Sequence, residues 1–212
     1  MREPLGQEEV ARLVAIDIPA SSYVNLGIGR PTMVANFLTG EQDVVLHTEN
    51  GMLGMGPEAL GDEVDPDLVN AGKFPITELP GAVYFDHAVS FSMIRGGHID
   101  VCVMGAFQVS QYGDLANWST GEAGAIPAVG GAMDLAVGAK QTWIMMTLFT
   151  KDGDAKLVRE CTYPLTGPHC VTRVYSDYGV FLIDREGVTV RDLYGITPDD
   201  LVRRLELPVR FA

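Results

Sequence analysis

Hydrophobic residues recur along the chain with two different spacings. In residues 7–16, Val10, Leu13 and Val14 follow the spacing of one helix face, and the glutamates before them favour a helix N-terminus. Residues 43–46 instead form a compact apolar run with β-branched side chains, which is typical of a buried strand. The pattern therefore predicts helices and strands that follow one another along the chain.

The same two spacings predict the remaining elements. Strands are expected at residues 23–29, 43–46, 83–85, 99–104, 142–146 and 179–183, and helices at residues 7–16, 31–38, 88–94, 132–139 and 198–205. Apolar strands that alternate with helices indicate an α/β fold, with an open, mostly parallel sheet flanked by helices. No repeat, low-complexity tract or Ser- or Gly-rich linker divides the chain, so we expect a single domain over residues 1–212.

The composition narrows the class of protein. Of the 212 residues, 47% are hydrophobic and 20% are charged, which suits a globular domain rather than a disordered segment. No apolar run approaches the ~20 residues that span a bilayer, so we expect no membrane association. The N-terminus lacks the basic start and apolar core of a secretory signal, and we expect the protein to be cytoplasmic.

Charge and cysteine content exclude further classes. A net charge of −13 argues against a protein that binds nucleic acid through its phosphates. The three cysteines, Cys102, Cys161 and Cys170, include no CxxC pair, so they support neither a disulfide framework nor a zinc site. We expect reduced thiols, with Cys161 and Cys170 as small buried hydrophobic residues, and we expect no metal.

Acidic residues gather in the first half of the chain. The segment from Glu58 to Asp67 holds five acidic residues in ten positions. It is either a solvated loop that keeps the protein soluble or a face for a basic partner. The sequence leaves both interpretations open.

A pair of glycines follows the first predicted strand. In Gly27-Ile28-Gly29-Arg30-Pro31-Thr32, Thr32 replaces the third glycine of the GxGxxG motif, and no Gly-Lys-Ser/Thr follows. We therefore expect neither a standard dinucleotide site nor a P-loop. The backbone amides of this loop could still hold an anion at a helix N-terminus.

A carboxylate stands at the tip of the strand predicted at residues 43–46. Glu49 follows this run closely, and the turn-forming pair Asn50-Gly51 comes directly after it. A carboxylate at the end of a buried strand is a candidate catalyst. The alternative is that Glu49 caps the turn or pairs with a cation, and these residues by themselves do not separate the two.

Six short blocks occur in one order along nearly the whole chain. They are Thr48-Glu49-Asn50-Gly51, Asn70-Ala71-Gly72-Lys73, Met93-Ile94-Arg95-Gly96-Gly97-His98, Gly113-Asp114-Leu115-Ala116-Asn117-Trp118, Gly130-Gly131-Ala132-Met133-Asp134-Leu135 and Pro164-Leu165-Thr166-Gly167. Together they resemble the beta subunits of family I coenzyme A transferases, although each block is weak by itself. The second and fourth blocks are closer to members that act on 3-oxoadipate, in aromatic catabolism, than to those that act on acetate and acetoacetate.

The resemblance implies a mechanism and a partner. Glu49 is then the nucleophile that carries CoA as a glutamyl thioester, while CoA passes from succinyl-CoA to a 3-oxo acid. That acid is 3-oxoadipate, or acetoacetate in the alternative. Coenzyme A is a substrate, and no cofactor is bound permanently. The family pattern also requires an alpha subunit, which supplies a glutamine to the oxyanion site, so a hetero-oligomer is implied.

The resemblance also assigns roles to individual residues. It implies that the backbone amide of Gly131 is an oxyanion donor, with Gly130 as the near alternative. It further implies four residues that contact substrate or CoA: Asn25, Asn50, Gly51 and Lys73. Lys73 could instead be a solvated loop lysine.

Two departures from the family pattern stand out. Thr48 replaces the usual serine before the catalytic glutamate and keeps a hydroxyl. Residues 122–129 carry no cation where the family has lysines, which questions the local substrate contacts rather than the reaction class. A non-catalytic acyl-CoA-binding scaffold of the same fold and a cysteine nucleophile are the competing interpretations. His47 and His98 flank the blocks but are not spaced for a metal site.

Overall fold

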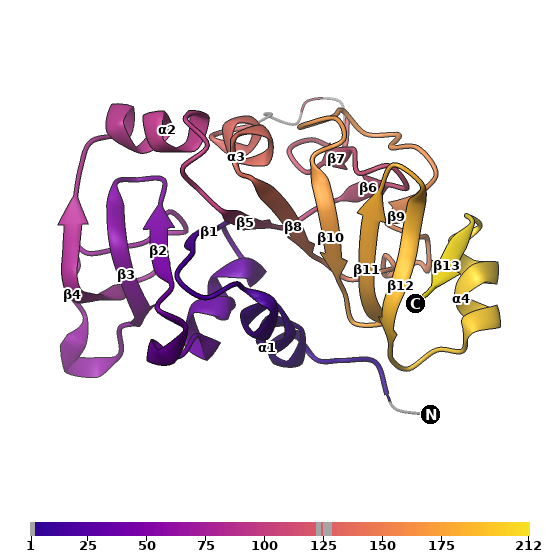
Figure 1. Cartoon of the computed structure of the whole chain (residues 1–212), viewed down its shortest axis with the longest axis horizontal. Helices are drawn as coiled ribbons and strands as arrows, with labels where there is room; N and C mark the ends of the chain where they lie inside the picture. Colours follow the sequence, from indigo (N-terminus) through magenta and orange to yellow (C-terminus); the bar gives the residue numbers. More distant parts are fainter. Residues whose placement is uncertain (1–2, 122–123, 125–128) are drawn as a thin grey trace.

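The computed structural model describes residues 3–121, 124 and 129–212 and contains a ten-stranded sheet (Figure 1). The strand order is β13-β12-β11-β10-β8-β5-β1-β2-β3-β4. The bounds are β1 Tyr23–Leu26, β2 Val45–Thr48, β3 Met52–Glu58, β4 Ile76–Tyr84, β5 Val101–Met104, β8 Gln141–Met145, β10 Val171–Tyr175, β11 Gly179–Asp184, β12 Gly187–Leu193 and β13 Val209–Phe211. A second sheet has the order β7-β6-β9, with β6 Gln108–Ser110, β7 Leu115–Ala116 and β9 Leu157–Val158.

The centre of the large sheet is parallel. Strands β10, β8, β5, β1 and β2 pair in parallel, and β13 joins β12 in parallel. Strands β3 and β4 extend one end of the sheet, and β11 and β12 the other, by antiparallel pairing. The expected open, mostly parallel sheet flanked by helices is confirmed. In register, Asn25 of β1 pairs with His47 of β2 and with Cys102 of β5, which places their side chains on one face.

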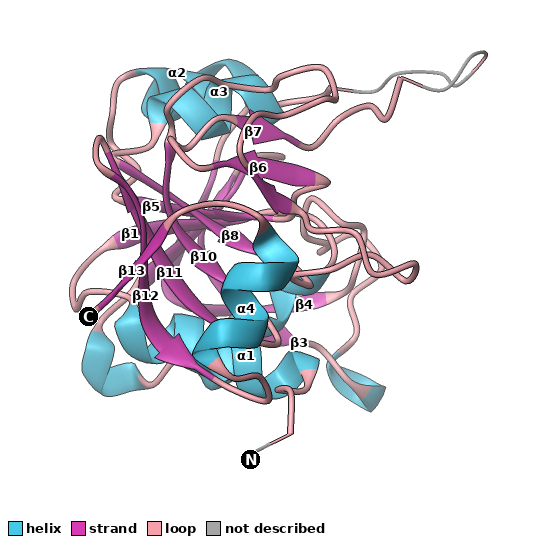
Figure 2. Cartoon of the chain, turned by 90° about the vertical axis from the view of Figure 1, so that its right-hand side faces the viewer, coloured by secondary structure: helices cyan, strands magenta, loops and turns pink. Residues whose placement is uncertain are grey.

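Helices cover both faces of this sheet (Figure 1; Figure 2). Their bounds are α1 Gln7–Asp17, α2 His87–Arg95, α3 Ala132–Gly138 and α4 Pro198–Leu205, with 3₁₀ helices η1 Arg30–Phe37, η2 Gly40–Gln42 and η3 Gly61–Glu63. One core joins α2, α3, α4 and the second sheet to residues such as Cys102 and Ile144. The other joins α1 and η1 to Val103 and Trp143 on the opposite face. Within the described ranges, none of the helices has both the length and the apolar character needed to cross a bilayer.

The helix predicted at residues 31–38 is present as a 3₁₀ helix rather than an α-helix. The segment is the 3₁₀ helix η1, which begins after Gly29 with its φ of 87°. The amide and the hydroxyl of Thr32 both donate to the Gly29 carbonyl, at 3.1 and 2.7 Å, and these i→i+3 bonds tighten the first turn. The four other predicted helices correspond to α1, α2, α3 and α4.

Several strands were not expected from the sequence. The prediction at residues 83–85 covers only the end of β4, and β3 lies in a segment with no predicted strand. Glycine and proline at positions 54, 56 and 57 weaken the strand signal of β3, and its pairing with β4 shifts register twice. Strands β10, β12 and β13 were also missed, because their polar and apolar residues give no compact apolar run.

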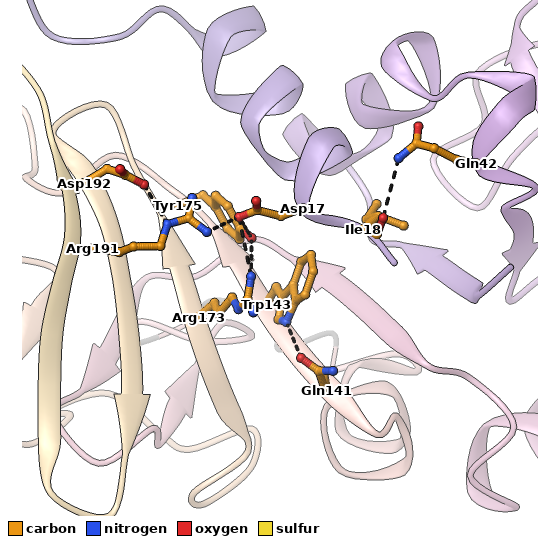
Figure 3. Close-up of polar contacts among 9 residues, drawn as sticks. All are labelled: Asp17, Ile18, Gln42, Gln141, Trp143, Arg173, Tyr175, Arg191 and Asp192. Atoms are coloured by element: carbon orange, nitrogen blue, oxygen red, sulfur yellow. Dashed lines mark hydrogen bonds and ion pairs between the residues drawn. The ribbon is translucent and has the colours of Figure 1, made fainter. Parts of the chain in front are cut away.

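A polar cluster fastens the end of α1 to the C-terminal half of the sheet (Figure 3). The carboxylate of Asp17 accepts hydrogen bonds from the Tyr175 hydroxyl (2.8 Å) and from Arg191, and lies 3.4 Å from the Arg173 guanidinium. Arg173 also stacks over the ring of Trp143, 4.7 Å from its centroid. Burial and the hydrogen bond to Asp17 raise the pKa of Tyr175. The cluster therefore links α1, β8, β10 and β12.

Candidate active site

The carboxyl ends of the central parallel strands meet at a cavity of about 440 Å³. Gly27 follows β1, Glu49 follows β2, Gly105 follows β5 and Met146 follows β8, and all four line the cavity. In open α/β sheets, ligands bind in the crevice at this edge. The fold therefore collects the loops after four strands around one space.

Glu49 is the first residue of a tight hairpin between β2 and β3. Thr48 pairs with Met52, and the Gly51 amide donates to the Thr48 carbonyl at 3.1 Å. Gly51 has a φ of 125°, and a Cβ there would stand 2.0 Å from the Phe85 carbonyl oxygen, so only glycine fits. This turn holds the half-buried Glu49 at the cavity wall.

Burial raises the pKa of Glu49 above that of an ordinary glutamate, and the positive charge of nearby His87 partly opposes the rise. Within the described part of the chain, no group donates a hydrogen bond to the Glu49 carboxylate. A carboxylate that is partly stripped of water and free of donors is more basic and more nucleophilic than a solvated one. These properties suit a nucleophile, and within the described residues Glu49 forms neither an ion pair nor a side-chain hydrogen bond that caps the turn.

The backbone at Gly131 lies directly against the Glu49 carboxylate. A Cβ on Gly131 would stand 2.6 Å from Glu49 Oε2 and 2.8 Å from Phe91 Cζ. Gly131 is also the residue that precedes α3, so its peptide group belongs to the start of that helix. Only glycine permits this approach of the main chain to the carboxylate.

A buried chain of side chains lies beneath Glu49. Asn25 Nδ2 lies 3.0 Å from His47 Nδ1 and donates to the His47 carbonyl at 3.2 Å, and His47 Nε2 lies 3.1 Å from Ser90 Oγ on α2. Because the amide nitrogen is a donor, His47 Nδ1 accepts and Nε2 carries the proton. Burial lowers the pKa of His47 to about 4, so the ring is neutral. This chain fixes the side chain of Asn25, which lines the cavity.

The structure brings some of the sequence-predicted residues together and leaves others outside the cavity. The cavity is lined by Asn25, Glu49, Gly130 and Gly131, and not by Asn50, Gly51 or Lys73. The Asn50 side-chain amide donates to the Val69 carbonyl at 2.9 Å and so ties the hairpin turn to the segment around Lys73. Lys73 itself is exposed, two residues beyond Ala71, which lines the cavity.

Two cations of the cavity wall were not predicted from the sequence. Arg30 and Lys156 both line the cavity, although they are 126 positions apart and come from η1 and from the segment before β9. Arg30 lies in the glycine loop whose amides were considered for anion binding, and this was the one sequence feature that pointed to Arg30. No sequence feature pointed to Lys156, since its segment contains no motif. Asn117 and Trp118, which end the fourth family-like block, also line the cavity.

The cysteines are poor candidates for a nucleophile. Burial raises the pKa of Cys161 to about 12 and that of Cys170 to about 11, and it raises the pKa of the fully buried Cys102 as well. A thiol with a raised pKa holds little of the reactive thiolate at neutral pH. Cys161 and Cys170 are half-buried rather than fully buried, and all three are free thiols.

Three other predictions have mixed outcomes. The acidic segment from Glu58 to Asp67 is largely exposed, which fits both a solvated loop and a face for a partner. His98 is exposed and does not line the cavity. Most of the cation-free segment at residues 122–129 lies outside the described residues, and Val129 at its end lines the cavity.

Comparison with known proteins gives one consistent family. Residues 7–202 match the family model described as Coenzyme A transferase. One subunit of the 3-oxoadipate CoA-transferase of Pseudomonas putida is 56% identical over 201 residues, which cover 95% of this chain and 94% of that protein. One subunit of the succinyl-CoA:3-ketoacid coenzyme A transferase of Helicobacter pylori is 43% identical over 201 residues, which cover 94% and 96%.

Solved structures share the fold at low sequence identity. Glutaconate coenzyme A-transferase from Acidaminococcus fermentans aligns with a TM-score of 0.68 and 16% identity, covering 99% of this chain and 88% of that chain. The decarboxylase AibA/AibB aligns with a TM-score of 0.70 and 18% identity, covering 97% and 85%. These two structures show the fold alone, and since they carry different reactions, the chemistry must come from the residues around the cavity.

Proposed function

This chain belongs to the coenzyme A transferase family, and from that premise we propose that it is the catalytic subunit of an enzyme that moves CoA from succinyl-CoA to 3-oxoadipate through a thioester on Glu49. The observation that carries the proposal is the Glu49 carboxylate, half-buried at the cavity wall with the backbone of Gly131 against it. The choice of substrates follows the relatives, in particular the 56% identical subunit of a 3-oxoadipate CoA-transferase.

The chemistry balances with a carboxylate as the only covalent catalyst. Glu49 attacks the thioester carbonyl of succinyl-CoA, and the C–S bond breaks. CoA leaves as a thiolate, and a mixed anhydride between Glu49 and succinate remains. The thiolate then attacks the Glu49 carbonyl carbon, which releases succinate and leaves a glutamyl-CoA thioester. A carboxylate of 3-oxoadipate attacks that thioester, and the same steps in reverse yield 3-oxoadipyl-CoA and free Glu49.

The site must stabilise the negative oxygen of each tetrahedral intermediate. We assign this role to the peptide amide of Gly131, whose backbone lies against Glu49 at the cavity, with Gly130 as the neighbouring alternative. Asn25, held by His47, offers a side chain at the same cavity. The half-buried setting of Glu49 adds to these effects, because electrostatic interactions strengthen where water is excluded.

A partner subunit completes the proposal. The relatives from Pseudomonas putida and Helicobacter pylori, whose own lengths the alignments almost fully cover, are each named as one subunit of their enzyme, so a second, alpha subunit is expected to assemble with this chain. We propose that the alpha subunit supplies the second oxyanion donor. Copurification of the two chains after joint expression tests the assembly, and full CoA-transferase activity of this chain by itself would contradict it.

Trapping the intermediate tests the nucleophile. The assembled enzyme, incubated with succinyl-CoA, is expected to gain the mass of CoA on the peptide that contains Glu49 and to lose activity when borohydride reduces the thioester. Glu49→Ala is expected to show neither change, and Glu41→Ala, at an exposed position outside the cavity, serves as the matched control. Full activity of Glu49→Ala would overturn the proposal, and tight acyl-CoA binding without exchange would favour the scaffold interpretation.

A substrate panel tests the acceptor. With succinyl-CoA as donor, 3-oxoadipate is expected to have a higher kcat/KM than acetoacetate or acetate. A preference for acetoacetate would leave the proposed reaction unchanged but make acetoacetate the acceptor. This is the alternative implied by the family resemblance.

A further inference from the structure

Two cations share the cavity with Glu49 and have no role in the chemistry above. Lys156 lies just before β9 and is half-buried. Its backbone is fixed on both sides, because its amide donates to the Leu148 carbonyl and its carbonyl accepts from the Val109 amide, both at 2.9 Å. Arg30 is exposed and begins η1. The two side chains therefore reach the cavity from different supports, one of them rigid.

Neither cation is neutralised within the described part of the chain. No ion pair there includes Lys156 or Arg30, and neither side chain makes a hydrogen bond. Burial and the charge of Arg30 lower the pKa of Lys156, while Asp177 raises it from beyond ion-pair distance. Two neighbouring cations that face a cavity without a counter-ion are stabilised when an anion binds between them.

The remainder of the cavity indicates which anion fits. Its wall includes Met104, Leu135, Met145 and Met146, which suit the methylene groups of an acyl chain. Within the described residues, no ion pair joins Glu49 to Arg30 or Lys156, so both cations are separate from the reacting carboxylate. A molecule that reacts with Glu49 at one end can thus present a second negative group to them at the other.

We propose that Lys156, assisted by Arg30, binds the distal carboxylate of the acyl group, so that the enzyme selects dicarboxylic over monocarboxylic acids. This inference rests on the proposed function and names the group that recognises its substrate class. Succinyl-CoA and 3-oxoadipate each carry a carboxylate at the end remote from the reacting carbonyl. A charge-assisted hydrogen bond from Lys156 stabilises a bound acid that has this carboxylate. An acid without it leaves the cation unpaired and therefore binds more weakly.

The phosphates of CoA are the other anions that could meet these cations. The half-buried position of Lys156 in an apolar wall favours the acyl group, because phosphates carry more charge and a larger hydration shell. The two sources differ in a measurable way. Every substrate pair in the reaction shares CoA, whereas only the dicarboxylic acids carry the distal carboxylate.

The test measures discrimination in the assembled enzyme. Acceptors are 3-oxoadipate and 3-oxohexanoate, which have the same chain length and differ at the distal end, with succinyl-CoA as the common donor. In Lys156→Met the ratio of kcat/KM values for the two acceptors is expected to fall about tenfold or more, chiefly through KM for 3-oxoadipate. Lys156→Arg is expected to restore much of the ratio, and Arg30→Met to lower it less. Lys151→Met, at an exposed position of the neighbouring turn outside the cavity, is the matched control.

Three outcomes decide between these sources. A selective loss for 3-oxoadipate supports the carboxylate site. An equal loss for both acceptors overturns it in favour of CoA binding or structure, and unchanged kinetics overturn it outright. In each of these cases the glutamyl thioester on Glu49 still forms, so failure of this inference is separate from failure of the proposed function.

Discussion

The main chain at Gly131 is in contact distance of the Glu49 carboxylate, with room for no side chain between them: a Cβ at position 131 would stand 2.6 Å from Oε2. The two residues come from loops 82 positions apart, one after β2 and one before α3. Their contact joins the proposed nucleophile to the proposed oxyanion donor. It also makes position 131 the place where a single methyl group tests the site.

Gly131→Ala is expected to reduce kcat by about 100-fold or more, because the methyl group must displace either Glu49 or Phe91 from its present position. Gly131 is buried beside Phe91, so the stability of the variant is measured along with its activity. The measurement is kcat together with the melting temperature of the assembled enzyme. Gly40→Ala is the control, because nothing lies within 4 Å of its Cβ position and its φ is ordinary. Equal activity of the two variants would contradict the contact.

The pH dependence of kcat/KM for succinyl-CoA should report the environment of Glu49 in the free enzyme. The nucleophile must be ionised, and burial raises its pKa, so activity is expected to fall on the acid side at a higher pH than an ordinary glutamate would give. His87→Gln removes the charge that lowers this pKa and should move the acid limb to still higher pH. His98→Gln, at an exposed position outside the cavity, should leave the limb in place. A limb that shifts in the opposite direction in His87→Gln would refute the assignment.

Local sequence signals predicted the structural features that depend on a single segment of the chain. Glu49 follows an apolar run and precedes Asn50-Gly51, and the structure gives this tip the tight turn that such a pair favours. Helices with clear periodicity, such as α1 and α4, were predicted within a residue or so of their bounds. In these places propensity and tertiary packing agree.

The parts that depend on distant segments could not be predicted. Asn25 meets His47 through the register of β1 on β2, and the cation pair of Arg30 and Lys156 arises only when the second sheet packs beside the first. Strand β3 was missed for a related reason, since its pairing with β4 overrides a local composition rich in glycine. Register and packing between segments are not encoded in any single window of the chain.

The neutral, buried His47 predicts a loss of stability in acid. Its pKa is about 4 in the folded protein, against 6.5 for an ordinary histidine. The unfolded state therefore binds more protons between these values, so this contribution is complete above pH ~6.5 and is lost as the pH falls toward ~4. The loss between pH 7 and pH 5 is expected to be about 2 kcal/mol in the free energy of unfolding.

Urea unfolding of the wild type and of His47→Gln across this pH range measures the effect. Glutamine keeps polar atoms near Asn25 and Ser90 but does not titrate, so the variant is expected to be less stable at pH 7 and to show a smaller drop by pH 5. Parallel curves for the two proteins would show that His47 is not the titrating group. His98→Gln should follow the wild type, because His98 is exposed.

The cluster around Asp17 holds α1 to the C-terminal half of the sheet, and we expect it to contribute to stability. Asp17 accepts from Tyr175 and from Arg191, and its side chain is only 20% exposed. Asp17→Asn leaves the partly buried guanidinium group of Arg173 without its carboxylate and Arg191 with Asp192 alone, which is expected to cost about 2 to 4 kcal/mol of unfolding free energy. The reference variant is Asp200→Asn, whose partner Arg203 is 75% exposed and whose loss is expected to cost about 0.5 kcal/mol or less. Because the cluster lies outside the cavity, kcat of the folded Asp17→Asn enzyme should stay near that of the wild type. If both variants lower the free energy of unfolding by a similar amount, the cluster contributes no more to stability than a surface ion pair.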